Sequence, residues 1–265
     1  MRVLVTGAAG TIGQVVTVGL TDRGHDVVGL DLAPQPMGEV WPWHVADCTD
    51  PDAVRAVFDE ERLDAVVHLA GHPGEADLPA ALASHVTTTA ALLDACVARD
   101  VTRFVYASSN HAVGRTPRRD RLGVDARPRP DTFYGVGKVA AEALLSLYAD
   151  RYAIDAIACR IGSFRPEPTS LRELSTWLSH DDGVRMVEAA LTVPAPGFAV
   201  LYGISANTRA WWDLEPGRAL GYEPLDDAEA FADRITPAPG DEAEAAYVGG
   251  PFTGDRFYRA ALDSS

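Results

Sequence analysis

A tyrosine and a lysine four residues apart, Tyr134 and Lys138, precede a stretch of helical periodicity in this 265-residue sequence. Apolar residues recur at helical spacing through 139–152, so the two polar side chains should share one helix face. A phenol has an ordinary pKa of about 10 and is a weak base at neutral pH, but a nearby ammonium group favours the phenolate. The pair could therefore accept a proton from an alcohol, although a bare Tyr-x-x-x-Lys is also common by chance.

Hydroxyl, amide and imidazole side chains follow the apolar run at 102–107, in the sequence Ser108-Ser109-Asn110-His111. If this run is a strand, the four side chains emerge at its carboxyl end, where the helix that carries Tyr134 should lie. A serine there could hydrogen-bond the same substrate oxygen that Tyr134 deprotonates. A strand, a serine pair and then Tyr-x-x-x-Lys resemble the short-chain dehydrogenases in their extended, sugar-acting branch.

The elements that must position these groups begin at the N-terminus. A β-branched apolar run at 3–6 leads into Gly7-Ala-Ala-Gly10-Thr-Ile-Gly13 and then into a helix-like stretch at 14–23. Glycines at this spacing let a pyrophosphate approach the backbone at the positive end of a helix. An ordinary glycine-rich turn between a strand and a helix would look the same.

Asp31 ends the next apolar run, at 25–30. An acidic residue about 20 residues beyond such glycines can accept hydrogen bonds from the adenosine ribose and repel a 2′-phosphate. The sequence therefore predicts NAD rather than NADP as the cofactor.

Strands and helices continue to alternate up to residue 161. Further strands are expected at 43–46, 64–69, 102–107 and 154–161, and further helices at 52–60, 78–99 and 139–152. This alternation predicts an α/β fold of the Rossmann type, a doubly wound parallel sheet whose ligand lies at the carboxyl ends of the strands.

The alternation stops after residue 161. We predict an NAD-binding domain with the catalytic helix over 1–161 and a small substrate-binding cap over 162–265, packed together as one compact unit. In the cap we expect helices at 182–192 and 226–234 and a strand at 198–201. Arg172 stands out because a guanidinium can hold a carboxylate by two parallel hydrogen bonds, although lone arginines are more often solvated or in structural ion pairs.

Composition excludes several classes of partner. A formal charge of -15 and a pI near 4.8 argue against nucleic acid and anionic membranes. The six arginines of 115–130 lie in a proline-broken segment without aromatic residues, which favours a solvated loop or a subunit contact. The three cysteines do not have the spacing of metal ligands, which predicts reduced thiols. We see no leader and no long apolar span, and we therefore expect a cytoplasmic protein.

No metal site is expected. His180-Asp181-Asp182 points in several directions on any regular backbone, and Ser179 or Asp181 suits the N-cap of a helix better.

Longer motifs across nearly the whole chain resemble the bacterial uronate dehydrogenases. They are Ser108-Ser-Asn-His111, Arg121-Leu-Gly123, Arg129-Pro-Asp131, Tyr134-Gly-Val136, Arg160-Ile-Gly-Ser163, Pro166-Glu-Pro168, Leu174-Ser-Thr-Trp177, Ser179-His-Asp-Asp182, Ser205-Ala-Asn207 and Trp211-Trp-Asp213. The resemblance implies NAD-dependent oxidation of a hexuronate, such as glucuronate or galacturonate, to an aldarolactone.

The resemblance also implies roles for single residues. Tyr134 would take the proton from the C1 hydroxyl, Lys138 would lower the pKa of the tyrosine and hold the nicotinamide ribose, and Ser109 would steady the reacting oxygen. The sugar acid would contact Ser109, Asn110, His111, Tyr134, Ser163 and Arg172, with Arg172 on its carboxylate. The predicted cofactor contacts are Gly7, Gly10, Thr11, Ile12, Gly13, Asp31, Leu32, Asp47, Cys48, Leu69, Ala70, Gly71, Tyr134, Lys138 and Ile161.

Two positions depart from the family pattern. Pro73 offers no hydroxyl where relatives often place a serine, and His72 is the predicted replacement contact. Gly137 stands where a serine commonly precedes the lysine, which should cost about 1 kcal/mol of helix propensity but no chemistry.

Two other functions fit parts of the sequence. A nucleotide-sugar epimerase or dehydratase would use the same fold without net NADH formation, although the short cap leaves little room for a nucleotide diphosphate. A non-catalytic dinucleotide sensor is the third reading, because fold alone does not fix function. We also expect a homo-oligomer.

Overall fold

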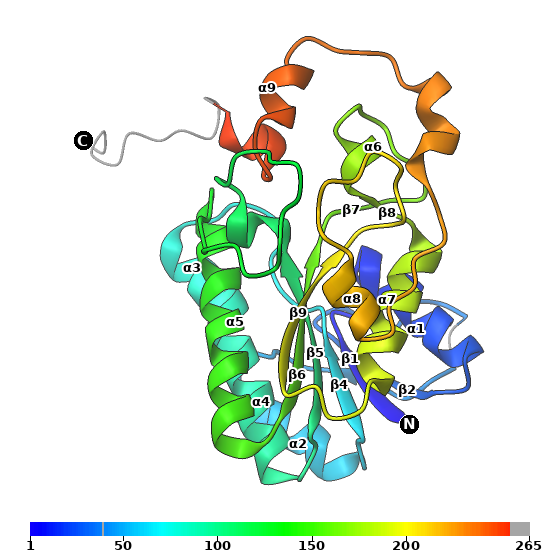
Figure 1. Ribbon diagram of the computed structural model, residues 1–265. Coiled ribbons are helices and arrows are strands. Elements are labelled where there is room, and N and C mark those ends of the chain that lie inside the picture. Colours follow the sequence, from blue (N-terminus) through cyan, green and yellow to red (C-terminus); the bar gives the residue numbers. More distant parts are fainter. Residues whose placement is uncertain (39, 255–265) are drawn as a thin grey trace.

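The computed structural model describes residues 1–38 and 40–254. Seven parallel strands form one sheet in the order β3-β2-β1-β4-β5-β6-β9 (Figure 1). The chain builds outward from β1 to β3 and then returns to the other side of β1 with β4. The connections that follow β1 and β4 therefore run in opposite directions, and such sheets bind ligands in the crevice between these connections. The predicted Rossmann-type, doubly wound sheet is confirmed.

The strands of the main sheet lie close to their predicted positions. They are β1 (Arg2–Thr6), β2 (Asp26–Asp31), β3 (Trp43–Val45), β4 (Ala65–His68), β5 (Arg103–Ser109), β6 (Asp155–Ile161) and β9 (Phe198–Gly203). A separate pair is formed by β7 (Ser163–Phe164) and β8 (Trp177–Leu178).

The helices include several short ones in the last third of the chain. The α-helices are α1 (Thr11–Asp22), α2 (Pro51–Glu60), α3 (Leu78–Leu82), α4 (Thr88–Ala98), α5 (Phe133–Tyr152), α6 (Glu173–Thr176), α7 (His180–Thr192), α8 (Glu215–Ala219) and α9 (Asp241–Ala245). A π-helical turn, η1 (Ala83–Thr87), joins α3 to α4, and 3-10 turns form η2 (Asn110–Val113), η3 (Ala228–Arg234) and η4 (Gly250–Thr253).

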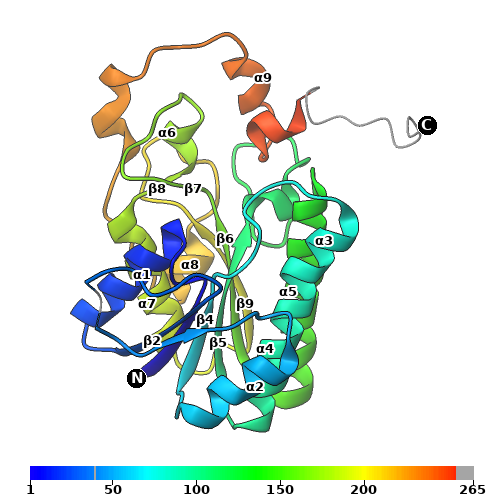
Figure 2. The same cartoon turned by 180° about the vertical axis from the view of Figure 1, so that it is seen from behind.

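Helices cover both faces of the sheet (Figures 1 and 2). On one face α2, α4 and α5 pack a core that includes Leu92, Phe104 and Leu145. On the other face α1 and α7 pack a core that includes Val16 and Met186. Each strand of the sheet interior is buried on both sides, which explains the continuous apolar runs in the sequence.

The predicted boundary after residue 161 does not follow the sheet. The strand that we assigned to the cap is β9, which pairs with β6 as the seventh strand of the main sheet. Likewise α7 packs beside α1 rather than in a separate cap. Ser179 is the N-cap of this helix, and its hydroxyl oxygen accepts from Asp182 N at 2.9 Å. Within the described part of 162–265, the elements that lie above the carboxyl ends of the strands include β7, β8, α6 and α9 (Figure 1). The last part of the predicted cap, 255–265, lies outside the described residues.

The helix expected over 78–99 is a continuous apolar helical segment in which the π-helical turn η1 separates α3 from α4. By length and composition Leu78–Ala98 could cross a membrane, with a mean hydropathy of 1.3 in its most apolar window, although the sequence had suggested no such span. Half of that window is buried inside the protein, and Leu92, Leu93 and Cys96 contribute to the core under α5. Packing against the sheet accounts for the apolar composition.

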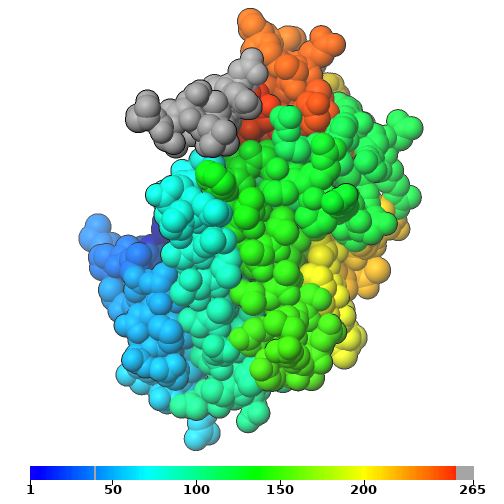
Figure 3. Space-filling view, turned by 90° about the vertical axis from the view of Figure 1, so that its left-hand side faces the viewer, coloured from blue at the N-terminus to red at the C-terminus, as the bar shows by residue number. Residues whose placement is uncertain are grey.

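The C-terminal segment 246–253 returns to the edge of the sheet. It runs beside the loop that follows β5, where Pro117 bridges to Tyr247 and Val248 N donates to Thr116 O at 3.1 Å. Figure 3 shows the red C-terminal residues lying directly against the green residues of this loop.

Candidate active site

Tyr134, Lys138 and Ser109 come together at the carboxyl end of β5. Tyr134 lies in the first turn of α5 and Lys138 in the next, with the Lys138 ammonium nitrogen 5.3 Å from the centroid of the Tyr134 ring. Lys138 Nζ also donates to Ala107 O of β5 at 2.7 Å. Ser109 is the last residue of that strand. The structure therefore brings the three predicted catalytic residues into one group.

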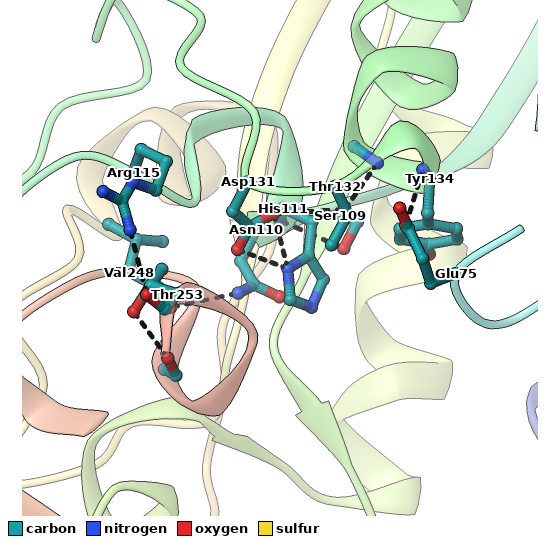
Figure 4. A network of polar contacts seen from close by, with 12 residues as sticks. Glu75, Ser109, Asn110, His111, Arg115, Asp131, Thr132, Tyr134, Val248 and Thr253 are labelled. Carbon is teal, nitrogen blue, oxygen red and sulfur yellow. Dashed lines mark hydrogen bonds and ion pairs between the residues drawn. The ribbon is translucent and has the colours of Figure 1, made fainter. Parts of the chain in front are cut away.

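The N-terminus of α5 is fixed by two side chains. Thr132 Oγ1 accepts from Gly135 N at 2.9 Å, and the Glu75 carboxylate accepts from Phe133 N at 3.1 Å and Tyr134 N at 3.3 Å. A carboxylate at a helix N-terminus satisfies free backbone donors and complements the helix dipole. Figure 4 shows Glu75 directly beside Tyr134. Glu75 was not predicted, because it belongs to the loop after β4, far from α5 in sequence.

Burial dominates the electrostatics of the pair. Burial raises the pKa of Tyr134, while the hydrogen bond with Ser109 lowers it and Asp131 raises it. Burial is the largest of these causes, and the lowering of the tyrosine pKa by Lys138 stays a prediction. Burial also lowers the pKa of Lys138 to about 7, against the opposing charge of Glu142.

Glu142 belongs to a buried polar group one turn beyond Lys138. Its carboxylate accepts from Arg160 Nε at 3.0 Å, from Arg160 Nη2 at 2.8 Å and from the Ser108 hydroxyl. The bidentate pair satisfies both charges inside the protein. It fastens α5 to β5 and β6 behind the catalytic side chains.

His111 and Asn110 are held on the substrate side. His111 Nδ1 lies 2.9 Å from the Asp131 carboxylate, whose side chain is fully buried. The His111 ring meets the Tyr134 ring edge-on, with the centroids 5.8 Å apart, and packs on Phe252 at 4.6 Å. Asn110 Nδ2 donates to Val248 O at 3.1 Å. Figure 4 shows this chain of contacts running from Tyr134 to the C-terminal segment.

Arg172 reaches the same carbonyl from the other side. Its Nη2 donates to Val248 O at 2.7 Å, and its Nη1 lies 3.4 Å from Ser163 Oγ and 3.5 Å from Thr176 Oγ1. Burial lowers the pKa of Arg172, opposed by Glu173, Glu244 and Asp131. Within 1–38 and 40–254, no hydrogen bond or ion pair joins its guanidinium to a carboxylate. A partly buried guanidinium that contacts only neutral oxygens can receive an anion.

Arg172 also borders a second space. Together with Thr176 it lines a cavity of about 850 Å³ under 237–247. The presence of Val248, Phe252 and this cavity near the site could not be predicted from the sequence, because it depends on how the C-terminal segment packs.

The glycine turn between β1 and α1 has the shape that a dinucleotide needs. Gly7 has φ +69, and a Cβ on it would lie 2.7 Å from Ala70 N. A Cβ on Gly13 would overlap Gly7 O and Ala8, so α1 approaches β1 closely only because position 13 is glycine. The Asp31 carboxylate accepts from Ala9 N at 2.9 Å and from Ala33 N at 3.0 Å. These features fit NAD, with the adenosine ribose beside Asp31.

The remaining predicted cofactor residues lie around the glycine turn or at the carboxyl ends of the other strands. Leu69 N donates to Thr6 O at 3.1 Å and Ala70 N to Thr6 Oγ1 at 3.2 Å, so the turn after β4 is tied to β1. Ile161 pairs with Ser109 in the sheet register. The others are Gly10, Thr11 and Ile12 at the start of α1, Leu32 after β2, Asp47 and Cys48 after β3, and Gly71 after β4.

His72, proposed as a substrate contact, is exposed and lies in the loop 70–77. Its backbone N donates to Ser84 Oγ at 2.6 Å, and its ring nitrogen Nδ1 lies 3.2 Å from Gly74 O. The loop also carries Glu75, so it lies next to Tyr134 at the start of α5. Among the described residues, no three His, Cys, Asp or Glu side chains are grouped as a metal site would require.

Comparison with known proteins gives a consistent picture. Residues 3–167 match the NAD dependent epimerase/dehydratase family. The chain is 38% identical to a uronate dehydrogenase of Agrobacterium fabrum, over 97% of this chain and 98% of that one. Its structure is similar to that of a mutant Agrobacterium tumefaciens uronate dehydrogenase complexed with NAD, with a TM-score of 0.90, 38% identity and coverage of 97% and 98%. It is also similar to a glucuronic acid dehydrogenase of Chromohalobacter salexigens, with a TM-score of 0.88, 34% identity and coverage of 95% and 96%.

Proposed function

Because the chain belongs to the NAD dependent epimerase/dehydratase family and, within it, to the uronate dehydrogenases, we propose that Tyr134 is the general base with which it oxidises C1 of a hexuronate. The chain is an NAD-dependent oxidoreductase that acts on uronates. The grouping of Tyr134, Lys138 and Ser109 at the carboxyl end of β5 supports the assignment of the base.

The chemistry divides among three side chains. Tyr134, as phenolate, takes the proton of the C1 hydroxyl, and the Ser109 hydroxyl steadies the reacting oxygen. Lys138 lies beside the phenol ring and, when protonated, favours the phenolate. NAD, when bound, accepts the hydride that leaves C1. Loss of a proton and a hydride from a hemiacetal carbon gives a lactone, so this step needs no hydrolytic group.

The contacts of Arg172 are the main support for a substrate that is a sugar acid. Its guanidinium contacts three neutral oxygens and lies within hydrogen-bond distance of Ser163, which is also proposed to bind substrate. A C6 carboxylate at Arg172 would neutralise a buried positive charge and form strong, charge-assisted hydrogen bonds. Asn110 and His111 would bind the sugar hydroxyls between Arg172 and Tyr134. The common carbonyl of Val248 fixes Asn110 and Arg172 relative to one another.

The test is NADH absorbance with glucuronate and galacturonate, compared with glucose and galactose. We expect NADH from the acids and little from the neutral sugars. Arg172→Gln should lower kcat/KM for the acids about 100-fold, since breaking a buried charged contact costs about 2–5 kcal/mol. Arg209→Gln, which removes an exposed ion pair with Glu229, is the control and should change little. Equal reaction of acids and neutral sugars would contradict the role of Arg172.

Cellular location and assembly also belong to the proposal. Cys48, Cys96 and Cys159 are buried free thiols, which supports a reducing compartment such as the cytoplasm. A homo-oligomer stays a prediction, to be tested by light scattering on the purified protein.

A further inference from the structure

A buried histidine next to Tyr134 has no role in the chemistry above. His85 is only 1% exposed and lies in the π-helical turn η1. Its ring meets the Tyr134 ring edge-on, with the centroids 5.0 Å apart and the planes at 86°. This is a favourable geometry for two rings, and it is closer than the contact between His111 and Tyr134.

The π-helical turn determines where His85 points. Such a turn inserts one extra residue into a helix and changes the register of the side chains that follow. Here it separates α3 from α4, and the hydroxyls of Thr88 and Thr89 donate to Ser84 O at 2.7 Å and His85 O at 2.6 Å. These bonds occupy carbonyl oxygens within the turn. The irregular turn is thus stabilised at the position that directs His85 toward α5.

Two glycines make room for the His85 ring. A Cβ on Gly137 would lie 3.0 Å from Cδ2 and 3.1 Å from Cβ of His85, and a Cβ on Gly71 would lie 2.8 Å from its Cε1. Gly137 belongs to α5, one residue before Lys138, and Gly71 to the turn after β4. The imidazole therefore fills the space between the turn that should contact NAD and the helix that carries the base. This packing explains why Gly137 has no side chain.

The ring is uncharged under ordinary conditions. Burial, together with the positive charge of Lys138, lowers the pKa of His85 to about 3. A neutral ring can pack against the phenol without adding a second positive charge beside Lys138.

We propose that His85 is a positioning residue for Tyr134: wedged between Gly71 and Gly137, its imidazole fixes the position of the phenol ring at the start of α5. The proposal rests on the uronate oxidation described above. Because proton transfer depends steeply on the position of the base, a shift of the ring by a fraction of an ångström should lower kcat. Substrate and cofactor binding should change little, since His85 need touch neither.

Gly137→Ala gives the most discriminating test. Alanine is the better helix former by about 1 kcal/mol, which offsets part of the cost of crowding against His85 and Ala81 O, so the variant should stay folded. Its methyl group should push His85 toward Tyr134 and lower kcat for glucuronate about 10-fold, with KM and the Kd for NAD within about two-fold. Ser146→Ala, in the same helix away from the site, is the control. An unchanged kcat in a folded Gly137→Ala protein would overturn the proposal.

The methyl group of Gly137→Ala would also lie 3.1 Å from Ala81 O, so the loss of kcat could arise there instead of at His85. A second variant, His85→Asn, distinguishes the two causes. His85→Asn alone should lower kcat about 10-fold, and Gly137→Ala added to it should cause no further loss, a non-additivity typical of residues in contact. Full additivity would assign the effect to Ala81 and contradict the proposal. If His85→Asn does not fold, the single Gly137→Ala variant decides. Failure of the parent protein to form NADH would instead contradict the proposed function.

Discussion

The cofactor side and the substrate side of the crevice are built in different ways. On the cofactor side, the glycine turn and Asp31 lie within a single βαβ unit, and backbone shape determines what can bind. On the substrate side, Asn110, Arg172 and Val248 come from three distant parts of the chain and meet through one carbonyl oxygen. The glycine turn thus depends on local backbone geometry, whereas the proposed site for the sugar acid depends on long-range packing.

Tyr134 lies where the two sides meet. It contacts His85, which packs on the cofactor-side turn, and His111, which belongs to the substrate side. Loss of the phenolic hydroxyl alone should therefore affect catalysis while the ring contacts to His85 and His111 are kept.

Tyr134→Phe should produce the largest effect. Loss of the phenolic oxygen removes the base, and kcat for glucuronate should fall by about 1,000-fold. The Kd for NAD, measured by titration calorimetry, should stay unchanged if the cofactor side is independent of the base. Tyr152→Phe, near the other end of the same helix and in contact with Tyr148, is the control. A Tyr134→Phe protein with nearly normal kcat would show that another group takes the proton.

Asp31→Asn should have a smaller effect that is confined to the cofactor side. The amide oxygen can accept from Ala9 N or from Ala33 N but not from both, since each donates to a different oxygen of the carboxylate, and the substitution removes the charge that repels a 2′-phosphate. We expect the ratio of kcat/KM for NADP to that for NAD to rise about 10-fold, with KM for the uronate unchanged. Asp26→Asn, at the other end of β2 and paired with Arg2, should leave the ratio unaltered. A variant that still excludes NADP would place the discrimination elsewhere.

The smallest effect concerns stability in acid. Burial, with the charges of Lys138 and His85, lowers the pKa of His68 to about 3 from 6.5. Between pH 6.5 and 3 the unfolded chain binds a proton that the folded protein does not, so the free energy of unfolding falls as the pH falls. His68→Gln should make the midpoint of urea unfolding less sensitive to pH between 6.5 and 5. The exposed His72→Gln is the control, and the same pH sensitivity in His68→Gln would contradict a buried neutral imidazole.

Sequence reasoning identified the parts of the site that depend on local spacing. The glycine turn, Asp31, Ser109 and the pair Tyr134 and Lys138 all lie at strand ends or in one helix turn, where periodicity predicts direction. The parallel sheet followed from the alternation of strands and helices. The strand at 198–201 was also predicted, but it was assigned to the cap rather than to the sheet, because the alternation stops after residue 161.

The same reasoning missed whatever depends on tertiary packing. Glu75, His85 and the carbonyl of Val248 reach the site from loops and turns that no motif marks. Spacing also placed Lys138 near the phenol but did not show that both groups are buried, and burial raises the pKa of Tyr134 and lowers the pKa of Lys138. Burial is a property of the assembled fold, which spacing alone does not reveal.

Transfer of the C1 hydrogen to the cofactor is the central claim, and isotopic labelling tests it most directly. Glucuronate carrying deuterium at C1 would be incubated with the protein and NAD, and the reduced cofactor and the sugar product examined by mass spectrometry. We predict one deuterium in each reduced cofactor formed and an aldarolactone without it. Deuterium retained in the sugar, with no net reduced cofactor, would contradict this account and favour an epimerase.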